Sequence, residues 1–256
     1  MSLKPKEKQI NLRLTEDGLQ FDNSILWLDS YSHGELSFIS SASQSRRKIK
    51  PKTIVSEETH QILQLFQPLP HALVCPYNRP FSIGKYELEL LPSGSMLGSS
   101  SLFIKTPEHS VLYAPLLHKE RSPLHKPMEL KPSDILILGC NSGPDSKPSP
   151  SKILETNRFL DHISNKVQHG QWPIVFCDDM LLAQEALLLI KTLDIPVCVH
   201  SSLYKMNKIY SFFGAGCEDI TTFHQKNGHR SEVLILPQKY RPHTFSRSWS
   251  QQAKVF

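Results

Sequence analysis

Histidine and cysteine are the residue types in this chain whose spacing would reveal a metal site. Among the twelve histidines, His118/His125 and His224/His229 are close neighbours in the sequence. Pairs of this kind in loop sequence are more typical of exposed polar histidines than of ligands. The five cysteines are scattered, odd in number and never spaced as CxxC. This usage indicates reduced, mostly buried thiols in an intracellular compartment.

Serine and aspartate clusters give no complete catalytic set. Glycines surround Ser95 in GSMLGSSS, but the G-x-S-x-G elbow and the Gly-Lys-Ser/Thr ending of a P-loop are both missing. Asp178 and Asp179 follow the apolar run PIVFC, and a helix N-cap is favoured over a functional role. Cys198 and His200 share one face of a predicted strand, where a core thiol is the favoured interpretation.

The basic residues are concentrated in one stretch. The net charge is +5 and the isoelectric point is near 8.9, so contact with a polyanion is compatible with the composition. In SRRKIKPK, Pro51 and the polar flanks predict an exposed loop or a helix start. Both a solvated face and a phosphate-contacting patch remain open for these cations. They are Arg46, Arg47, Lys48, Lys50 and Lys52.

The elements that must position these residues are mostly strands in the first half of the chain. Apolar or alternating runs bounded by turn residues predict strands at ILWLD, LSFIS, HALVCPY, YELELLPSG, SLFIKT, VLYAPL and DILILG. One helix is predicted over 56–66, where Ser56 supplies a capping signal.

The second half alternates between helices and strands. Helices are predicted over 152–167, 180–193 and 203–212, and strands at PIVFC, IPVCVH and EVLILP. Because each strand run is apolar on both faces, we expect parallel strands with crossover helices. The predicted organisation is one domain over 1–150, a second over 151–236, and a basic tail or return segment over 237–256.

Taken in order, these motifs resemble the metallo-β-lactamase/β-CASP nucleases, in the branch of ligase-associated DNA exonucleases and mRNA 3'-end processing factors. FISSASQSRR lies where that family has its H-x-H-x-D-H metal loop, and LPSGSMLGSS is similar to its Ala-Gly-His turn. DILILGCNSG is similar to the strand that ends in Thr-Glu-Ser-Thr. The stretch from IVFCDDM to KMNKIY resembles the inserted β-CASP segment, so the likeness spans nearly the whole chain.

This resemblance implies an α/β fold, a metallo-β-lactamase-like αββα sandwich with an inserted β-CASP-like parallel α/β domain. The late histidines of the family have no counterpart, so a sandwich that is incomplete at its C-terminus is one expectation. The positions that correspond to the family's metal ligands hold Ser41, Ser43, Ser45, Arg46, Ser95, Leu116 and Gly139.

Those residue types are poor metal ligands. A serine hydroxyl binds Zn²⁺ weakly at neutral pH, and Arg46 would put a permanent cation where a dication sits in the family. The resemblance therefore implies a site without metal or other cofactor. What remains is a serine-lined cleft bordered by Arg46 and Arg47, which can hydrogen-bond phosphate oxygens without activating water.

The expected function is that of a catalytically inactive exonuclease-like protein, a nucleic-acid-binding or scaffold subunit in DNA repair or RNA processing. Its expected partners are DNA or RNA and an active nuclease, ligase or helicase. MSLKPKEKQINLRL lacks a secretory apolar run and no segment approaches a membrane span, so a cytoplasmic location is predicted. Two alternatives remain: a truncated paralogue without function, or a metal-dependent hydrolase with relocated ligands such as His33, His109, His118 or His125.

Overall fold

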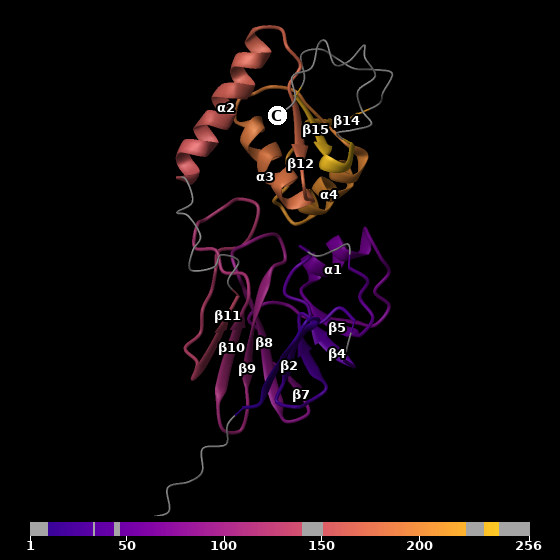
Figure 1. Cartoon of the computed structure of the whole chain (residues 1–256), viewed down its shortest axis with the longest axis vertical. Coiled ribbons are helices and arrows are strands. Elements are labelled where there is room, and N and C mark those ends of the chain that lie inside the picture. Colours follow the sequence, from indigo (N-terminus) through magenta and orange to yellow (C-terminus); the bar gives the residue numbers. More distant parts are fainter. Residues whose placement is uncertain (1–9, 33, 44–46, 140–150, 224–232, 241–256) are drawn as a thin grey trace, which may run out of the picture. The chain divides into compact units, whose positions relative to one another are not determined.

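Two compact units make up the chain, residues Met1–Asn141 and Ser142–Phe256. The structure, a computed structural model, describes residues 10–32, 34–43, 47–139, 151–223 and 233–240 (Figure 1). The predicted boundary after residue 150 and the predicted tail beyond residue 240 both lie outside the described residues. The fold is mixed α/β, with three sheets and four α-helices among the described residues.

Unit 1 contains two sheets. The first has six strands in chain order, antiparallel from β1 to β3 and parallel from β3 to β6. Its strands are β1 (Leu12–Thr15), β2 (Gly18–Phe21), β3 (Leu26–Leu28), β4 (Leu36–Phe38), β5 (Lys52–Val55) and β6 (Ala72–Val74). The predicted strands ILWLD, LSFIS and HALVCPY are confirmed as β3, β4 and β6.

The second sheet has the strand order β11-β10-β9-β8-β7 and is antiparallel except for the parallel pair β10/β11. These strands run side by side in Figure 1. Four of the five were predicted, and β7 was missed because it is short and only partly buried. Their bounds are β7 (Phe81–Ile83), β8 (Tyr86–Pro92), β9 (Ser100–Lys105), β10 (Ser110–Ala114) and β11 (Ile135–Leu138).

One apolar core joins the two sheets of unit 1. Phe38 and Ile54 of the first sheet and Leu88 and Ile104 of the second are fully buried in the same cluster. Phe38 also meets Tyr113 of β10 edge to face, with ring centroids 6.2 Å apart. Burial of each such side chain contributes about 1.5–3 kcal/mol, so the core fixes how the strand ends of the two sheets meet.

Helix α1 (Glu57–Gln64) confirms the helix predicted over 56–66, and it follows β5 directly. The Ser56 hydroxyl caps it by accepting a hydrogen bond from the Thr59 amide at 3.1 Å. The helix stops short of the predicted end at residue 66. A proline at position 68 disfavours helical continuation.

The basic stretch before α1 differs from the prediction at one end. Lys52 was expected in an exposed loop or at a helix start, but it is the first residue of strand β5. The following Thr53, Ile54 and Val55 are β-branched, a residue type that favours strands. The prediction therefore missed strand β5 because its apolar residues directly follow the charged residues of SRRKIKPK.

Unit 2 is a parallel sheet with crossover helices, as the alternation predicted. The strand order is β12-β15-β13-β14. Ala183 and Leu187 of α3 and Leu203 of α4 share an apolar cluster with one face of the sheet. The elements are α2 (Lys152–Gln168), β12 (Ile174–Cys177), α3 (Met180–Lys191), β13 (Val197–Val199), α4 (Ser201–Phe212), β14 (Ile220–Thr222) and β15 (Val233–Pro237). Within the described parts of the chain, no helix has the length and apolar character to cross a membrane.

Candidate functional site

Four loops of unit 1 meet at one end of the two sheets. They follow β4, β8, β10 and β11, and they contain those of the described residues that the resemblance assigned to metal-ligand positions. We name this end the serine edge, defined as residues 40–43, 93–101, 115–118 and 139. Backbone and side-chain hydrogen bonds connect its loops, as described below.

The loop after β4 is held at both ends. The Ser40 amide donates to Asp29 Oδ1 at 2.7 Å, and the Ser40 carbonyl accepts from the Ser100 amide at 2.8 Å. Ser41 is 2% exposed, and its hydroxyl shares a 2.8 Å hydrogen bond with that of Ser43. Ser43 itself is exposed, so it can offer a hydroxyl to a ligand while Ser41 stabilises the loop.

The turn after β8 is organised around the buried Ser99. Its hydroxyl accepts from the Ser93 hydroxyl at 2.8 Å and from the amides of Ser95 at 3.3 Å and Met96 at 3.0 Å. The Gly98 carbonyl accepts from the hydroxyls of Ser56 at 2.6 Å and Thr59 at 2.8 Å, which ties the turn to the start of α1. Ser95 is half-buried at the tip.

Backbone contacts bring the last two loops to the same end. The His118 amide donates to the Ser93 carbonyl at 3.1 Å, so the loop that contains Leu116 lies beside the serine turn. The Gly139 amide donates to the Ala114 carbonyl at 3.3 Å. A Cβ at Gly139 would lie 2.2 Å from the Pro115 carbonyl oxygen, so only glycine allows this approach.

Asp29 adjoins this edge and was not singled out from the sequence. It directly follows β3 and has a left-handed backbone with a φ of 52°, which aspartate tolerates better than most residues. Its Oδ2 accepts from the Tyr113 hydroxyl at 2.9 Å. Desolvation raises the pKa of the Asp29 carboxyl, although the hydrogen bonds from Ser40 and Tyr113 oppose that rise. A polar residue closing an apolar strand was the available signal.

The basic cluster is spread along its loop. The Arg47 guanidinium carbon lies 5.7 Å from the Tyr31 ring centroid, and the Arg47 carbonyl accepts from Gln67 Nε2 at 2.7 Å. Burial and the Asp29 charge raise the pKa of Tyr31, and Arg47 opposes this effect. Arg47 is therefore electrostatically connected to the serine edge. Ser45 and Arg46 lie outside the described residues.

Lys52 lies at the other end of the strands. It pairs with Leu36 at the start of β4, whereas Ser40 follows the end of β4. At about 3.3 Å per residue, Lys52 and Ser40 are roughly 13 Å apart along the strand direction. Arg47, Lys48 and Lys50 are all exposed, and only the beginning of this loop adjoins the serine edge.

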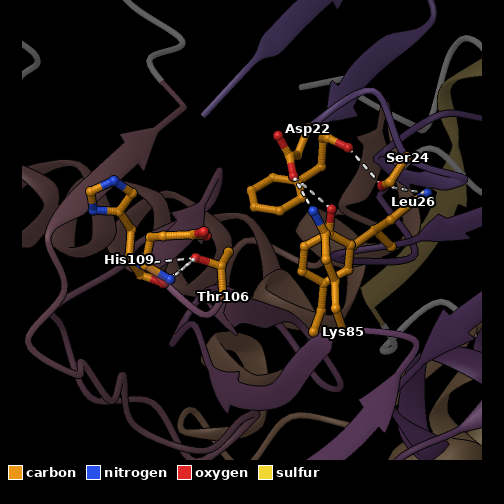
Figure 2. A network of polar contacts seen from close by, with 9 residues as sticks. Asp22, Ser24, Leu26, Lys85, Thr106 and His109 are labelled. Atoms are coloured by element: carbon orange, nitrogen blue, oxygen red, sulfur yellow. Dashed lines mark hydrogen bonds and ion pairs between the residues drawn. The ribbon is translucent and has the colours of Figure 1, made fainter. Parts of the chain in front are cut away.

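The described residues contain no group of three or more His, Cys, Asp and Glu side chains that could hold a metal ion. Of the proposed relocated ligands, His109 belongs to the β9–β10 turn, where its amide donates to the Thr106 hydroxyl at 2.8 Å (Figure 2). His118 lies at the serine edge, at the opposite end of β10. His125 is half-buried, and His33 lies outside the described residues. The histidines that can be located thus form no metal site.

The predicted site residues of unit 2 have structural roles. Asp179 is the N-cap of α3, where its Oδ1 accepts from the amides of Leu181 and Leu182, both at 2.8 Å, which confirms that prediction. His200 caps α4 by accepting from the Ser202 amide at 3.1 Å. Cys198 is buried as a core thiol, as expected.

Comparisons with known proteins give a distant likeness. No family model matches the chain. It is 21% identical over 226 residues to a protein from Opitutus terrae described as a probable DNA ligase, a match that covers 86% of this chain and 22% of that protein. The chain therefore spans about a fifth of the length of that relative.

A solved structure gives a likeness of fold. It is the crystal structure of a protein of unknown function from Enterococcus faecalis V583, with a TM-score of 0.50 and 15% sequence identity. The likeness covers 79% of this chain and 58% of that chain. At this identity the match concerns the arrangement of strands and helices alone.

Proposed function

We propose that this chain is a non-catalytic relative of the metallo-β-lactamase/β-CASP nucleases that binds nucleic acid at the serine edge and acts together with a DNA ligase. The observation that supports the proposal is the meeting of the four loops that the resemblance assigns to the family's ligand positions and that hold hydroxyls, an aliphatic side chain and glycine. The exposed Arg47 and Lys48 lie further along the loop that begins at this edge after β4. Such a surface can bind phosphate oxygens but has no group that would hold a catalytic metal.

The association with ligation rests on the distant likeness to a probable DNA ligase. Because the match covers only a fifth of that protein, the matching region is a candidate accessory domain joined to other domains there. A separate chain with the same role would hold the strand while a partner acts on it. The fold class and the basic balance of the chain are compatible with this role.

Fluorescence anisotropy of a labelled single-stranded oligonucleotide tests the binding. In the full-length chain, we expect Arg47→Ala/Lys48→Ala to weaken binding at low salt. Each lost phosphate contact should reduce the slope of log affinity against log salt by about 0.7 for single strands. The matched control is Lys50→Ala/Lys52→Ala, which removes the same charge from the other end of the loop and should change binding less.

Equal losses in the two double variants would indicate general charge attraction and would remove the serine edge from the proposal. Unchanged affinity in Arg46→Ala/Arg47→Ala/Lys48→Ala would remove it as well. Metal content and nuclease activity test the non-catalytic part separately. Stoichiometric zinc or manganese, together with nuclease activity that a chelator abolishes, would refute that part.

A further inference from the structure

Helix α4 carries a basic and aromatic strip on its exposed side. Lys205, Lys208 and Phe212 are separated by three and four residues, so they lie on one side of the helix. All three are exposed, and Phe212 is 76% exposed. We name these three residues the α4 strip. The other side of the helix is buried against unit 2 through Leu203, Met206, Asn207 and Tyr210.

Neighbouring rings support this strip. The Lys208 ammonium lies 5.2 Å from the ring centroid of Tyr204, one helical turn earlier. Phe213 packs edge to face with Phe212, with centroids 5.0 Å apart and an interplanar angle of 86°. The aromatic groups are thus partly fixed before a ligand arrives, which lowers the entropy lost on binding.

The charge along α4 has one sign. The helix contains no aspartate or glutamate, and Lys239 adds a cation near its first turn. Burial and Lys239 lower the pKa of the capping His200, which favours its neutral form, so the positive charge on this helix comes from its lysines. Glu218 follows Cys217 in the chain. Asn207, on the buried side of α4, makes two hydrogen bonds to the Cys217 backbone, at 2.8 and 2.9 Å. The exposed side is therefore positive.

We propose that the α4 strip is a second binding surface for single-stranded nucleic acid, in which Lys205 and Lys208 contact phosphates and Phe212 stacks on a base. The inference rests on the proposed function and extends it to unit 2. An acidic peptide would use the lysines but gain little from a planar ring. Flexible single strands offer both phosphates and unpaired base faces, and proteins that bind them combine cationic grooves with aromatic stacking.

The dimensions suit this ligand. From Lys205 to Phe212 the helix rises about 10 Å at 1.5 Å per residue. Stacked nucleotides repeat at about 3.4 Å along one strand, so the strip covers roughly three nucleotides. A duplex hides its base faces, which leaves Phe212 without a stacking partner.

Anisotropy with labelled oligothymidylate and oligouridylate of about 12 nucleotides tests the strip in the full-length chain. We expect Phe212→Ala and Phe212→Leu each to weaken binding about tenfold, because stacking on one base is lost and leucine replaces only apolar area. Phe212→Trp should retain binding, and its added emission should be quenched by the oligonucleotide. Lys205→Ala/Lys208→Ala should reduce the salt slope by about 1.4, whereas Phe212→Ala should leave the slope unchanged. The two probes distinguish DNA from RNA.

The matched controls are Leu182→Ala, which removes another exposed apolar side chain of unit 2, and Lys166→Ala/Lys191→Ala, which removes two charges from α2 and α3. If the wild-type chain binds neither probe at low salt, the proposed function fails, and this inference fails with it. If the wild type binds but the α4 variants match it or match their controls, only the α4 strip is overturned. Circular dichroism verifies that every variant is folded.

Discussion

The two ends of the unit 1 sheets use the same residue type in opposite ways. At the end away from the serine edge, Asp22 accepts from Tyr86 at 2.8 Å and from Lys85 at 3.1 Å, a contact drawn in Figure 2. Burial raises the pKa of Asp22, but the hydrogen bonds from Tyr86 and Lys85 outweigh it and leave the pKa lowered. Beside the serine edge, Asp29 has a raised pKa, and the Ser40 amide and Tyr113 hydroxyl that donate to it are uncharged.

The two aspartates therefore have different roles: Asp22 contributes to surface electrostatics, and Asp29 positions a loop. Asp22 is stabilised as an ion by a partner that solvent reaches, so its contribution is screened. Asp29 instead orients the Ser40 amide and the Tyr113 hydroxyl, and thereby the loop that contains Ser41 and Ser43. Most hydroxyls of the serine edge likewise bind protein groups, which leaves ligand contact to Ser43 and the cations of the adjoining loop.

The largest expected effect comes from removing the Asp29 carboxyl. Asp29→Ala leaves the Ser40 amide and the Tyr113 hydroxyl without this acceptor, and we expect a loss of about 2–4 kcal/mol in the free energy of unfolding. Asp29→Asn keeps the acceptor for the Ser40 amide and tolerates the left-handed backbone, and its Nδ2 can donate to the Tyr113 oxygen in place of the original bond, so it should cost less than about 1 kcal/mol. Urea unfolding of the full-length chain, followed by circular dichroism, measures both.

The pH dependence distinguishes the two Asp29 variants further. A carboxyl whose pKa is raised on folding binds its proton more tightly in the folded state. Its contribution is therefore most favourable below the unfolded pKa and declines as pH rises through the folded pKa. Asp29→Asn should remove this decline. Equal stabilities of the alanine and asparagine variants would contradict the positioning role.

A smaller effect is expected at the cap of α1. Ser56→Ala removes the acceptor for the Thr59 amide and the donor to the Gly98 carbonyl, and should cost about 1–2 kcal/mol. Asp179→Ala in unit 2 removes a more exposed cap whose two hydrogen bonds go to amides of its own helix, and should cost about 1 kcal/mol. Hydrogen exchange should show faster exchange in the turn 93–99 for Ser56→Ala alone. Unchanged exchange there would contradict the link between α1 and the serine edge.

The smallest effect belongs to Asp22. Because its pKa is lowered on folding, it stabilises the folded state above its unfolded pKa, and the contribution is lost as pH falls through the folded pKa. Asp22→Asn should therefore reduce the loss of thermal stability between about pH 6 and pH 3, by less than about 1 kcal/mol because Lys85 is exposed. Melting curves at several pH values measure this. A larger change in the pH dependence of stability for Asp22→Asn than for Asp29→Asn would contradict the expected order of the two effects.

The sequence predicted the elements better than the site. In long apolar runs such as those of β8, β10 and α3, the apolar residues follow a single spacing, that of a strand or that of a helix. The structure confirms these predicted elements. Strands β5, β7 and β14 were missed because they have three or four residues and because lysines and polar residues mask their alternation. The approach of Ser100 to Ser40, or of Tyr113 to Asp29, joins residues 60 and 84 positions apart. Such contacts depend on how the two sheets pack, which local patterns do not encode.

Strand β15 is the last strand of unit 2 in the sequence but lies between β12 and β13. During synthesis, β12 and β13 emerge from the ribosome before β15, the strand that lies between them. They cannot form their hydrogen bonds with β15 until the chain up to Pro237 has been synthesised. For that interval the apolar side chains of β12 have no partner strand and one edge of β13 stays unpaired, a condition that favours aggregation of nascent chains. The order of strands therefore makes unit 2 a candidate client for a chaperone while it is being translated.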